Sequence, residues 1–204
     1  MAVVQNPIIG KARQKFGNAI FQNWKGLNVL RTKPLEVKNP KSTRQTEQRV
    51  QFTNTQNFSR SILGLIKIGL RGLAIGKSEF NIFISENIKF FNNTSTGDIV
   101  TTPLNLVVSK GTLIKLESVT ATAAGFNVSI EWNPSGAGNP DDKIYVLYFN
   151  KITAETLVIA SGKVRADGSL TIASPWTNLG ASIVSIFAGN IAGQVSDNVN
   201  VAVS

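Results

Sequence analysis

The stretch FNVSIEWNPSGAGNPDDKIYVLYFN, residues 126–150, contains two apolar runs of different character on either side of a loop. In residues 126–132 the apolar side chains alternate with polar ones, as in a β-strand that buries one face; they are Phe126, Val128, Ile130 and Trp132. Residues 143–150 are apolar at consecutive positions, which predicts a central strand covered on both faces. Residues 134–142, rich in Gly, Pro and Asp, predict the loop between them.

The same half of the chain offers further strands. The candidate segments are residues 113–122, 156–160, 169–173, 182–188 and 195–203, and Asp167-Gly168 predicts a hairpin turn between two of them. So many short strands in a chain without Cys predict a β-sandwich. Their spacing and residue character resemble an immunoglobulin-like or fibronectin type III domain, which implies an adhesion, spacer or decoration module.

Charge divides the chain into two parts. Residues 1–97 hold 15 of the 21 Lys and Arg but 4 of the 12 Asp and Glu, a net charge of +11, whereas residues 98–204 sum to −2. We therefore predict two domains, a basic N-terminal docking region of residues 1–97 and a β-sandwich of residues 98–204. The basic part is suited to an anionic partner or to a place inside an assembly.

The N-terminal half is predicted to be α+β, in a chain that is mainly β. Residues 18–24 and 27–31, separated by Lys25-Gly26, predict a β-hairpin. Pro34 and Pro40 bracket an extended connector. Ser42 with Gln45 is a capping-box pattern that predicts a helix over residues 43–63, whose core-facing side would be Val50, Asn54, Phe58, Ile62 and, beyond it, Leu65. Residues 78–91 predict a second helix, with an alternating strand as the competing interpretation.

Cations surround the predicted hairpin and continue into the first helix. The candidate contact residues for assembly or for nucleic acid are Lys11, Arg13, Lys15, Trp24, Lys25, Arg31, Lys33, Lys38, Lys41, Arg44 and Arg49. With Phe16, Phe21 and Trp24 among them, this region has the residue types that stack on bases and bind phosphates. The alternative is that the aromatic side chains fill a small core and the cations face solvent or a neighbouring subunit.

The sequence contains no Cys and no His. This excludes thiolate nucleophiles, disulfides, Cys/His zinc sites and histidine bases, and we predict a protein without catalytic residues, cofactor or metal. Two weaker alternatives exist. The carboxylates of Asp141-Asp142 are of the type that binds calcium, but adjacent Asp residues suit a solvated turn. Glu131 beside Trp132 suggests a glycosidase, but the strand alternation places Glu131 on the exposed face.

The start of the chain, MAVVQNPIIGKARQK, lacks the order of a secretion signal and is interpreted as the mature N-terminus. The most apolar window, residues 62–75, is too short and too charged for a transmembrane segment. A membrane-surface segment stays an alternative there, because Lys67 and Arg71 are four residues apart and share one helical face.

A set of short motifs carries a family resemblance. They are Gly17-Asn18, Trp24-Lys25-Gly26, Arg31-Thr32-Lys33-Pro34, Asn39-Pro40 and Thr46-Glu47-Gln48-Arg49, followed by a β-rich tail. Together they resemble a family of basic proteins of about this length that is known as a domain of unknown function. The resemblance implies a bacterial or phage origin and no activity, cofactor or catalytic residue.

These observations lead to three functional hypotheses. The first is a non-enzymatic structural protein of an assembly, a bacteriophage virion component made in the bacterial cytoplasm. Its basic half would dock to other virion subunits or to further copies, and its sandwich would project or mediate contacts. The alternative is a nucleic-acid-binding protein that uses the hairpin cations and aromatic side chains, and a carboxylate- or Lys-based enzyme ranks last.

Overall fold

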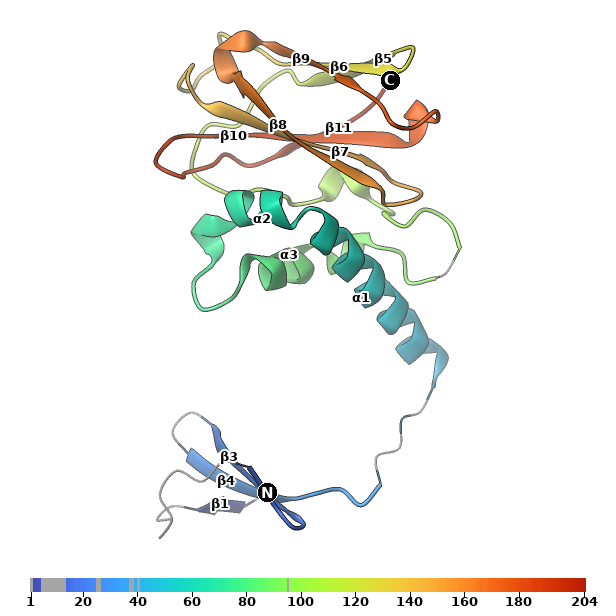
Figure 1. Cartoon of the computed structure of the whole chain (residues 1–204), viewed down its shortest axis with the longest axis vertical. Helices are drawn as coiled ribbons and strands as arrows, with labels where there is room; N and C mark the ends of the chain where they lie inside the picture. Colours follow the sequence, from blue (N-terminus) through green and yellow to red (C-terminus); the bar gives the residue numbers. More distant parts are fainter. Residues whose placement is uncertain (1, 5–13, 25–26, 37–38, 40, 95) are drawn as a thin grey trace. The chain divides into compact units, whose positions relative to one another are not determined.

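The structure, a computed structural model, describes residues 2–4, 14–24, 27–36, 39, 41–94 and 96–204 (Figure 1). It consists of two compact units, Met1–Lys41 and Ser42–Ser204. We call them the N-terminal unit and the main unit. As a whole the fold is mixed α+β and mainly β.

The N-terminal unit is one antiparallel sheet with strand order β1-β4-β3-β2. Its strands are β1 (Ala2–Val4), β2 (Gln14–Phe16), β3 (Ala19–Trp24) and β4 (Leu27–Thr32). The predicted hairpin is confirmed, since β3 pairs with β4 from Ala19 opposite Thr32 to Trp24 opposite Leu27. Its turn, Lys25-Gly26, lies outside the described residues. Strands β1 and β2, of three residues each, were not predicted.

The main unit contains two antiparallel sheets. One has the order β5-β6-β9 and the other β11-β10-β7-β8. Their bounds are β5 (Thr120–Ala124), β6 (Asn127–Glu131), β7 (Lys143–Asn150), β8 (Thr156–Val164), β9 (Ser169–Ala173), β10 (Ser182–Gly189) and β11 (Val199–Ala202). The two sheets face each other across one apolar core, to which Val128 and Ile130 of β6 and Val146 and Val184 of the larger sheet contribute.

The larger sheet is covered on its second face by helices (Figure 1). They are α1 (Thr43–Ser61), α2 (Leu63–Gly69) and α3 (Glu79–Asn87), with the short 3₁₀ helices η1 (Arg71–Leu73) and η2 (Ile88–Phe90). A second core joins Phe58, Ile66 and Phe83 of the helices to Phe149 of β7 and Phe187 of β10. Strand β7 is therefore buried on both sides, as the apolar run 143–150 predicted.

Both predicted helices are confirmed, and so is the predicted cap at Ser42; Ser78 caps the second helix in the same way. The Ser42 hydroxyl accepts a hydrogen bond from Gln45 N at 3.4 Å, and Ser78 accepts one from Asn81 N at 3.3 Å. The competing strand for residues 78–91 is wrong, because Ile82 and Phe83 pack into the core from a helix. Among the described residues, no helix combines the length and the apolar character that crossing a membrane would require.

The contacts divide the chain after Lys41 and not after residue 97, where the charge step had placed the boundary. The physical reason lies in the larger sheet, whose strands β7 and β10 carry apolar side chains on both faces. The three-stranded sheet covers one face, and α1, α2 and α3 cover the other. The helices consequently fold as a layer of the main unit.

Three details of the β region differ from the prediction. Of the segment 113–122, only residues 120–122 belong to a strand, β5, which continues to Ala124. Phe126 is 72% exposed because it lies in the β5–β6 turn, before the alternation begins. The hairpin at Asp167-Gly168 is wrong, since β8 pairs with β7 whereas β9 pairs with β6 in the other sheet. The turn there, with Gly168 at φ +72°, carries the chain from one sheet to the other.

Candidate assembly and nucleic-acid interface

Two of the predicted contact cations meet on one face of the N-terminal sheet. Lys15 of β2 and Arg31 of β4 both lie directly opposite Ile20 of β3. Residues opposite each other in an antiparallel sheet point to the same side, and strands two apart are separated by about 10 Å. Both side chains are exposed. Sheet register therefore forms a two-cation row that the chain order alone does not show.

Aromatic Phe21 does not join this row. It follows Ile20 in β3 and so points to the opposite face, where it lies across from Leu30 and Gln14. It is half-buried. Lys15 and Arg31 therefore do not form one platform with Phe21 for stacking and phosphate binding, because the cations and the aromatic ring lie on opposite faces of the sheet.

The remaining candidates of the N-terminal unit are only partly described. Lys33 is exposed just beyond β4, where its backbone N–H donates to Asn18 O at 2.7 Å, and Lys41 is exposed as well. The backbone of Trp24 pairs with Leu27 at the end of the hairpin. Lys11, Arg13, Lys25 and Lys38 lie outside the described residues.

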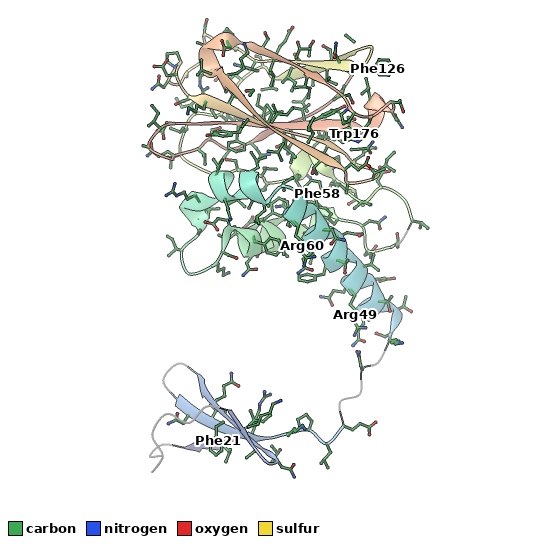
Figure 2. The ribbon with its side chains drawn as sticks, viewed as in Figure 1. Phe21, Arg49, Phe58, Arg60, Phe126 and Trp176 are labelled. Carbon is green, nitrogen blue, oxygen red and sulfur yellow. The ribbon has the colours of Figure 1, made fainter. Side chains whose placement is uncertain are left out.

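Arg44 and Arg49 belong to the main unit, on helix α1, and both are exposed. Five residues on a helix correspond to a rotation of about 140°, so the two guanidinium groups leave the helix in different directions. They do not form one cluster. Figure 2 shows Arg49 on the half of α1 that extends beyond the sheet, whereas Phe58 lies at the half that packs on it.

Two open hollows flank the first half of α1, and Arg49 and Thr53 line both. One, of about 450 Å³, lies between α1 and Thr94, Gly97 and Ile99. The other, of about 410 Å³, contains Phe52, which is 43% exposed, and Ile88. The sequence prediction missed Phe52 and the segment 94–99. The sequence did contain an indication for Phe52, because it is an apolar residue in a predicted helix that lies away from the core-facing side of Val50 and Phe58.

Amide side chains hold α1 against the segment that follows the helices. Gln51 Nε2 donates to Phe91 O at 3.0 Å, and Asn54 Nδ2 donates to Asn92 O at 3.2 Å. Thr55 and Ser59, both fully buried, donate their hydroxyls to carbonyls one turn earlier in the helix. Two of the polar residues that weaken the intrinsic helicity of α1, Gln51 and Asn54, thus attach the helix to the neighbouring segment, while Thr55 and Ser59 satisfy their hydroxyls within the helix.

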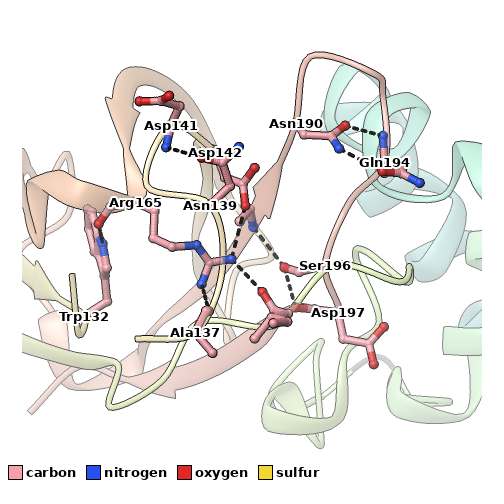
Figure 3. Close-up of polar contacts among 12 residues, drawn as sticks. Trp132, Ala137, Asn139, Asp141, Asp142, Arg165, Asn190, Gln194, Ser196 and Asp197 are labelled. Atoms are coloured by element: carbon pink, nitrogen blue, oxygen red, sulfur yellow. Dashed lines mark hydrogen bonds and ion pairs between the residues drawn. The ribbon is translucent and has the colours of Figure 1, made fainter. Parts of the chain in front are cut away.

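The acidic loop around Asp141-Asp142 is built around an arginine (Figure 3). Asp142 and Arg165 are both buried, with Nη2 and Oδ2 3.5 Å apart. The guanidinium also donates to Ile114 O at 2.6 Å and Ala137 O at 3.2 Å. Asp142 thus faces a cation of the protein itself, which opposes the calcium interpretation. Across the described chain, no group of three or more acidic side chains could hold a metal ion.

The position of Glu131 follows the prediction. It lies at the end of β6 with its side chain exposed, opposite Thr120 of β5 and Ser169 of β9. No carboxylate from either partner strand stands across from it, so the pairing of two carboxylates that a glycosidase requires is not formed by these neighbours.

Comparisons with known proteins identify a family for this chain but no curated relative. The search of curated proteins found no match. The family resemblance is confirmed at the level of a domain of unknown function, since the match runs from within the N-terminal unit to the last residue. Residues 10–204 fit the model of a family of unknown function, DUF6266, and the chain belongs to that family.

Proposed function

We propose that this chain is a non-enzymatic structural protein of a macromolecular assembly, specifically a bacteriophage virion component of the capsid, neck or tail. It would be made in the bacterial cytoplasm and end up in the virion. The N-terminal unit would dock to other virion subunits or to further copies of the chain, while the main unit would project or supply contacts.

The observation that carries the proposal is the distribution of charge between the two units. The N-terminal unit has eight Lys and Arg and one Glu, a net charge of +7 in 41 residues. The main unit, with 13 basic and 11 acidic residues in 163, has a net charge of only +2. A small, separate and strongly basic sheet suits a docking element that recognises an anionic surface.

The strand order of the main unit supports an immunoglobulin-like or fibronectin type III assignment. Labelled along the chain from A, the strands give A, B and E in one sheet, formed by β5, β6 and β9. Strands C, F and G, with one extra strand beside C, form the other sheet. The core immunoglobulin sheets separate A, B and E from C, F and G in the same way, although the fourth strand along the chain, β8, pairs with C here and not with E. Domains of this architecture commonly serve as spacers or contact modules, which fits a projecting role.

Nucleic acid is the second candidate partner. The cross-strand row of Lys15 and Arg31 favours it, because cations spaced across a sheet face suit a phosphate backbone. The separation of Phe21 onto the other face argues for contacts to phosphates more than to bases.

Light scattering behind a sizing column, with absorbance at 260 and 280 nm, distinguishes the two. A defined oligomer free of nucleic acid would support assembly, whereas a monomer carrying nucleic acid would put the second candidate first. The double variant Lys15→Glu with Arg31→Glu should lose the oligomer. Reversal of two exposed main-unit cations, Lys115→Glu with Lys143→Glu, should keep it.

The virion assignment has its own test. Particles purified from the source bacterium after prophage induction should contain the chain in constant ratio to other particle proteins. Its absence from such particles, with the protein present in the lysed cells, would refute the assignment.

A further inference from the structure

Three segments that are distant in the sequence meet at one edge of the main unit: the end of α2 with η1, residues 109–111, and the turn 190–194. Lys110 N donates to Gly69 O at 3.1 Å. A Cβ atom on Gly193 would lie 3.5 Å from Arg71 Nη1. In Figure 3 the turn that carries Asn190 and Gln194 passes beside the helical segment.

Exposed aliphatic side chains gather on these segments. Ile75, just after η1, is 88% exposed, and Ile191, in the turn, is 92% exposed. Leu73 and Ile68 are 39% and 38% exposed. Single exposed apolar residues are ordinary, but four on adjoining segments indicate a surface that meets another apolar phase.

Four cations lie on or directly beside the same segments. Lys67, Arg71, Lys77 and Lys110 are all exposed. The acidic residues next to these segments are Glu79 at the start of α3, which is half-buried, and Asp197, which accepts a hydrogen bond from Gly111 N at 3.1 Å. We call the four aliphatic and four cationic residues the tip surface. Four cations against two acids leave it net positive.

The apolar face of α2 is not available for binding. Leu65, Ile66 and Leu70 are fully buried in the core beneath the larger sheet. This overturns the idea of a helix that lies on a membrane through residues 62–75, because its apolar side is already covered. What remains exposed are the tips of two connections.

We infer that the tip surface binds peripherally to an anionic lipid bilayer, with Ile75 and Ile191 entering the boundary between headgroups and acyl chains. Lys67, Arg71, Lys77 and Lys110 then lie at the level of the lipid phosphates. Aliphatic side chains suit the acyl-chain boundary of such a bilayer, and the cations beside them suit its anionic headgroups. This inference does not depend on the assembly function proposed above.

The shape of the surface favours a bilayer over a protein partner. Ile191 projects from a tight turn closed by Asn190 N to Gln194 O at 3.0 Å and by Gly193 N to Asn190 O at 3.1 Å. Ile75 precedes Gly76, which turns the chain at φ +74°. Two projecting side chains need a surface that deforms around them. A second copy would bring the same four cations face to face, which opposes self-association here.

The test is flotation of the full chain with phosphatidylcholine vesicles that contain phosphatidylserine, against pure phosphatidylcholine vesicles. We expect binding to the anionic vesicles that weakens with salt. The variant Ile75→Asn with Ile191→Asn should bind more than about tenfold more weakly. Lys67→Ser with Lys110→Ser should bind about 30-fold more weakly, at the free energy typical of a cation near an anionic surface.

The control variant is Leu104→Asn with Phe126→Asn, which removes two other exposed apolar side chains and should bind as the wild type does. Because the chain has no Cys, Ile191→Cys labelled with an environment-sensitive dye gives a second readout, a blue shift on anionic vesicles.

The inference is overturned if the Ile75 and Ile191 double variant floats as well as the wild type, since the basic N-terminal unit would then be responsible. It is also overturned if the chain does not float with the anionic vesicles. Binding to polyglutamate in place of the vesicles would overturn it as well, since the cations would then bind an acidic protein.

Discussion

Replacing Arg165 with methionine is predicted to lower the free energy of unfolding of the main unit by about 3–5 kcal/mol. Arg165 is 1% exposed, and its guanidinium donates to the carbonyls of Ile114 and Ala137 besides facing Asp142. Methionine fills a similar volume, so the loss comes mainly from the two carbonyls and the carboxylate that lose their cation.

The magnitude follows from what the substitution leaves behind. Removing one partner of a buried ion pair leaves the other charge buried without a counter-ion. Here that charge is the Asp142 carboxylate, whose side chain is 3% exposed. The indole of Trp132 donates to the backbone carbonyl of Arg165 at 2.8 Å, and that bond survives the change. For a unit of 163 residues, a loss of this size corresponds to a melting temperature lower by about 6–20 °C.

The assay is urea unfolding of the full chain, followed by tryptophan fluorescence and far-UV circular dichroism. Adding Asp142→Asn to Arg165→Met should restore part of the loss, because the stranded charge is gone. The control is Lys163→Met, which removes an exposed cation 3.9 Å from Asp167 and should cost less than about 1 kcal/mol. A loss below about 1 kcal/mol for Arg165→Met, or no recovery in the double variant, would refute the reasoning.

Two further substitutions test other close contacts of the main unit by the same unfolding measurement. Gly111→Ala should cost about 1–3 kcal/mol, because a Cβ atom there would overlap the carbonyl oxygen of Val195. Gly64→Ala, in α2 with open space around it, should instead stabilise by about 0.5–1 kcal/mol; equal effects would contradict the geometry. Asn198→Ala should cost about 2–4 kcal/mol, since its side chain accepts from two backbone N–H groups and donates to Leu106 O. Asn57→Ala, on the exposed side of α1, should be close to neutral, and a similar loss there would refute the assignment.

Much of the fold follows from periodicity, but periodicity does not name the partner of a buried face. The run 143–150 correctly predicts a strand covered on both sides. It does not reveal that helices cover one side and a second sheet the other, because an apolar face carries no label of what it packs against. This is why the charge step after residue 97 gave a different boundary from the contacts.

The sequence did not predict the two short strands or the buried arginine, each for a local reason. Strands β1 and β2 have three residues each, too few for an alternation to be recognised. Arg165 is ordinarily a surface residue type, and its burial depends on the loop 133–142 folding over it. Gly138, at φ +132°, allows that close approach, since a Cβ atom there would lie 2.6 Å from the Arg165 Cζ. No pattern in the sequence links these two positions.

The candidate contact residues were predictable as a composition but not as an arrangement. Exposed cations are evident from the sequence, whereas the row of Lys15 and Arg31 depends on the register of three strands. The tip surface was predicted only in part: the sequence offered a membrane-surface segment over residues 62–75 with Lys67 and Arg71, but it gave no sign that Lys110 and Ile191 join it. Ile75 and Ile191 each stand beside turn residues, a pattern that suggests exposure, but only the fold brings their segments together.

Polar side chains fix the backbone of the main unit near the tip surface. The segment between the helices and β5 is long, its described residues form no strand, and amide side chains hold it at several points. Asn87 exchanges two hydrogen bonds with the backbone of Val107, and Asn198 and Asn200 both donate to Leu106 O. Because these buried and half-buried amides restrain the backbone on both sides, the 109–111 segment and the neighbouring turn keep their positions against α2. Substitution of an exposed tip residue should therefore change binding and leave the unfolding free energy unchanged, which makes the two measurements independent.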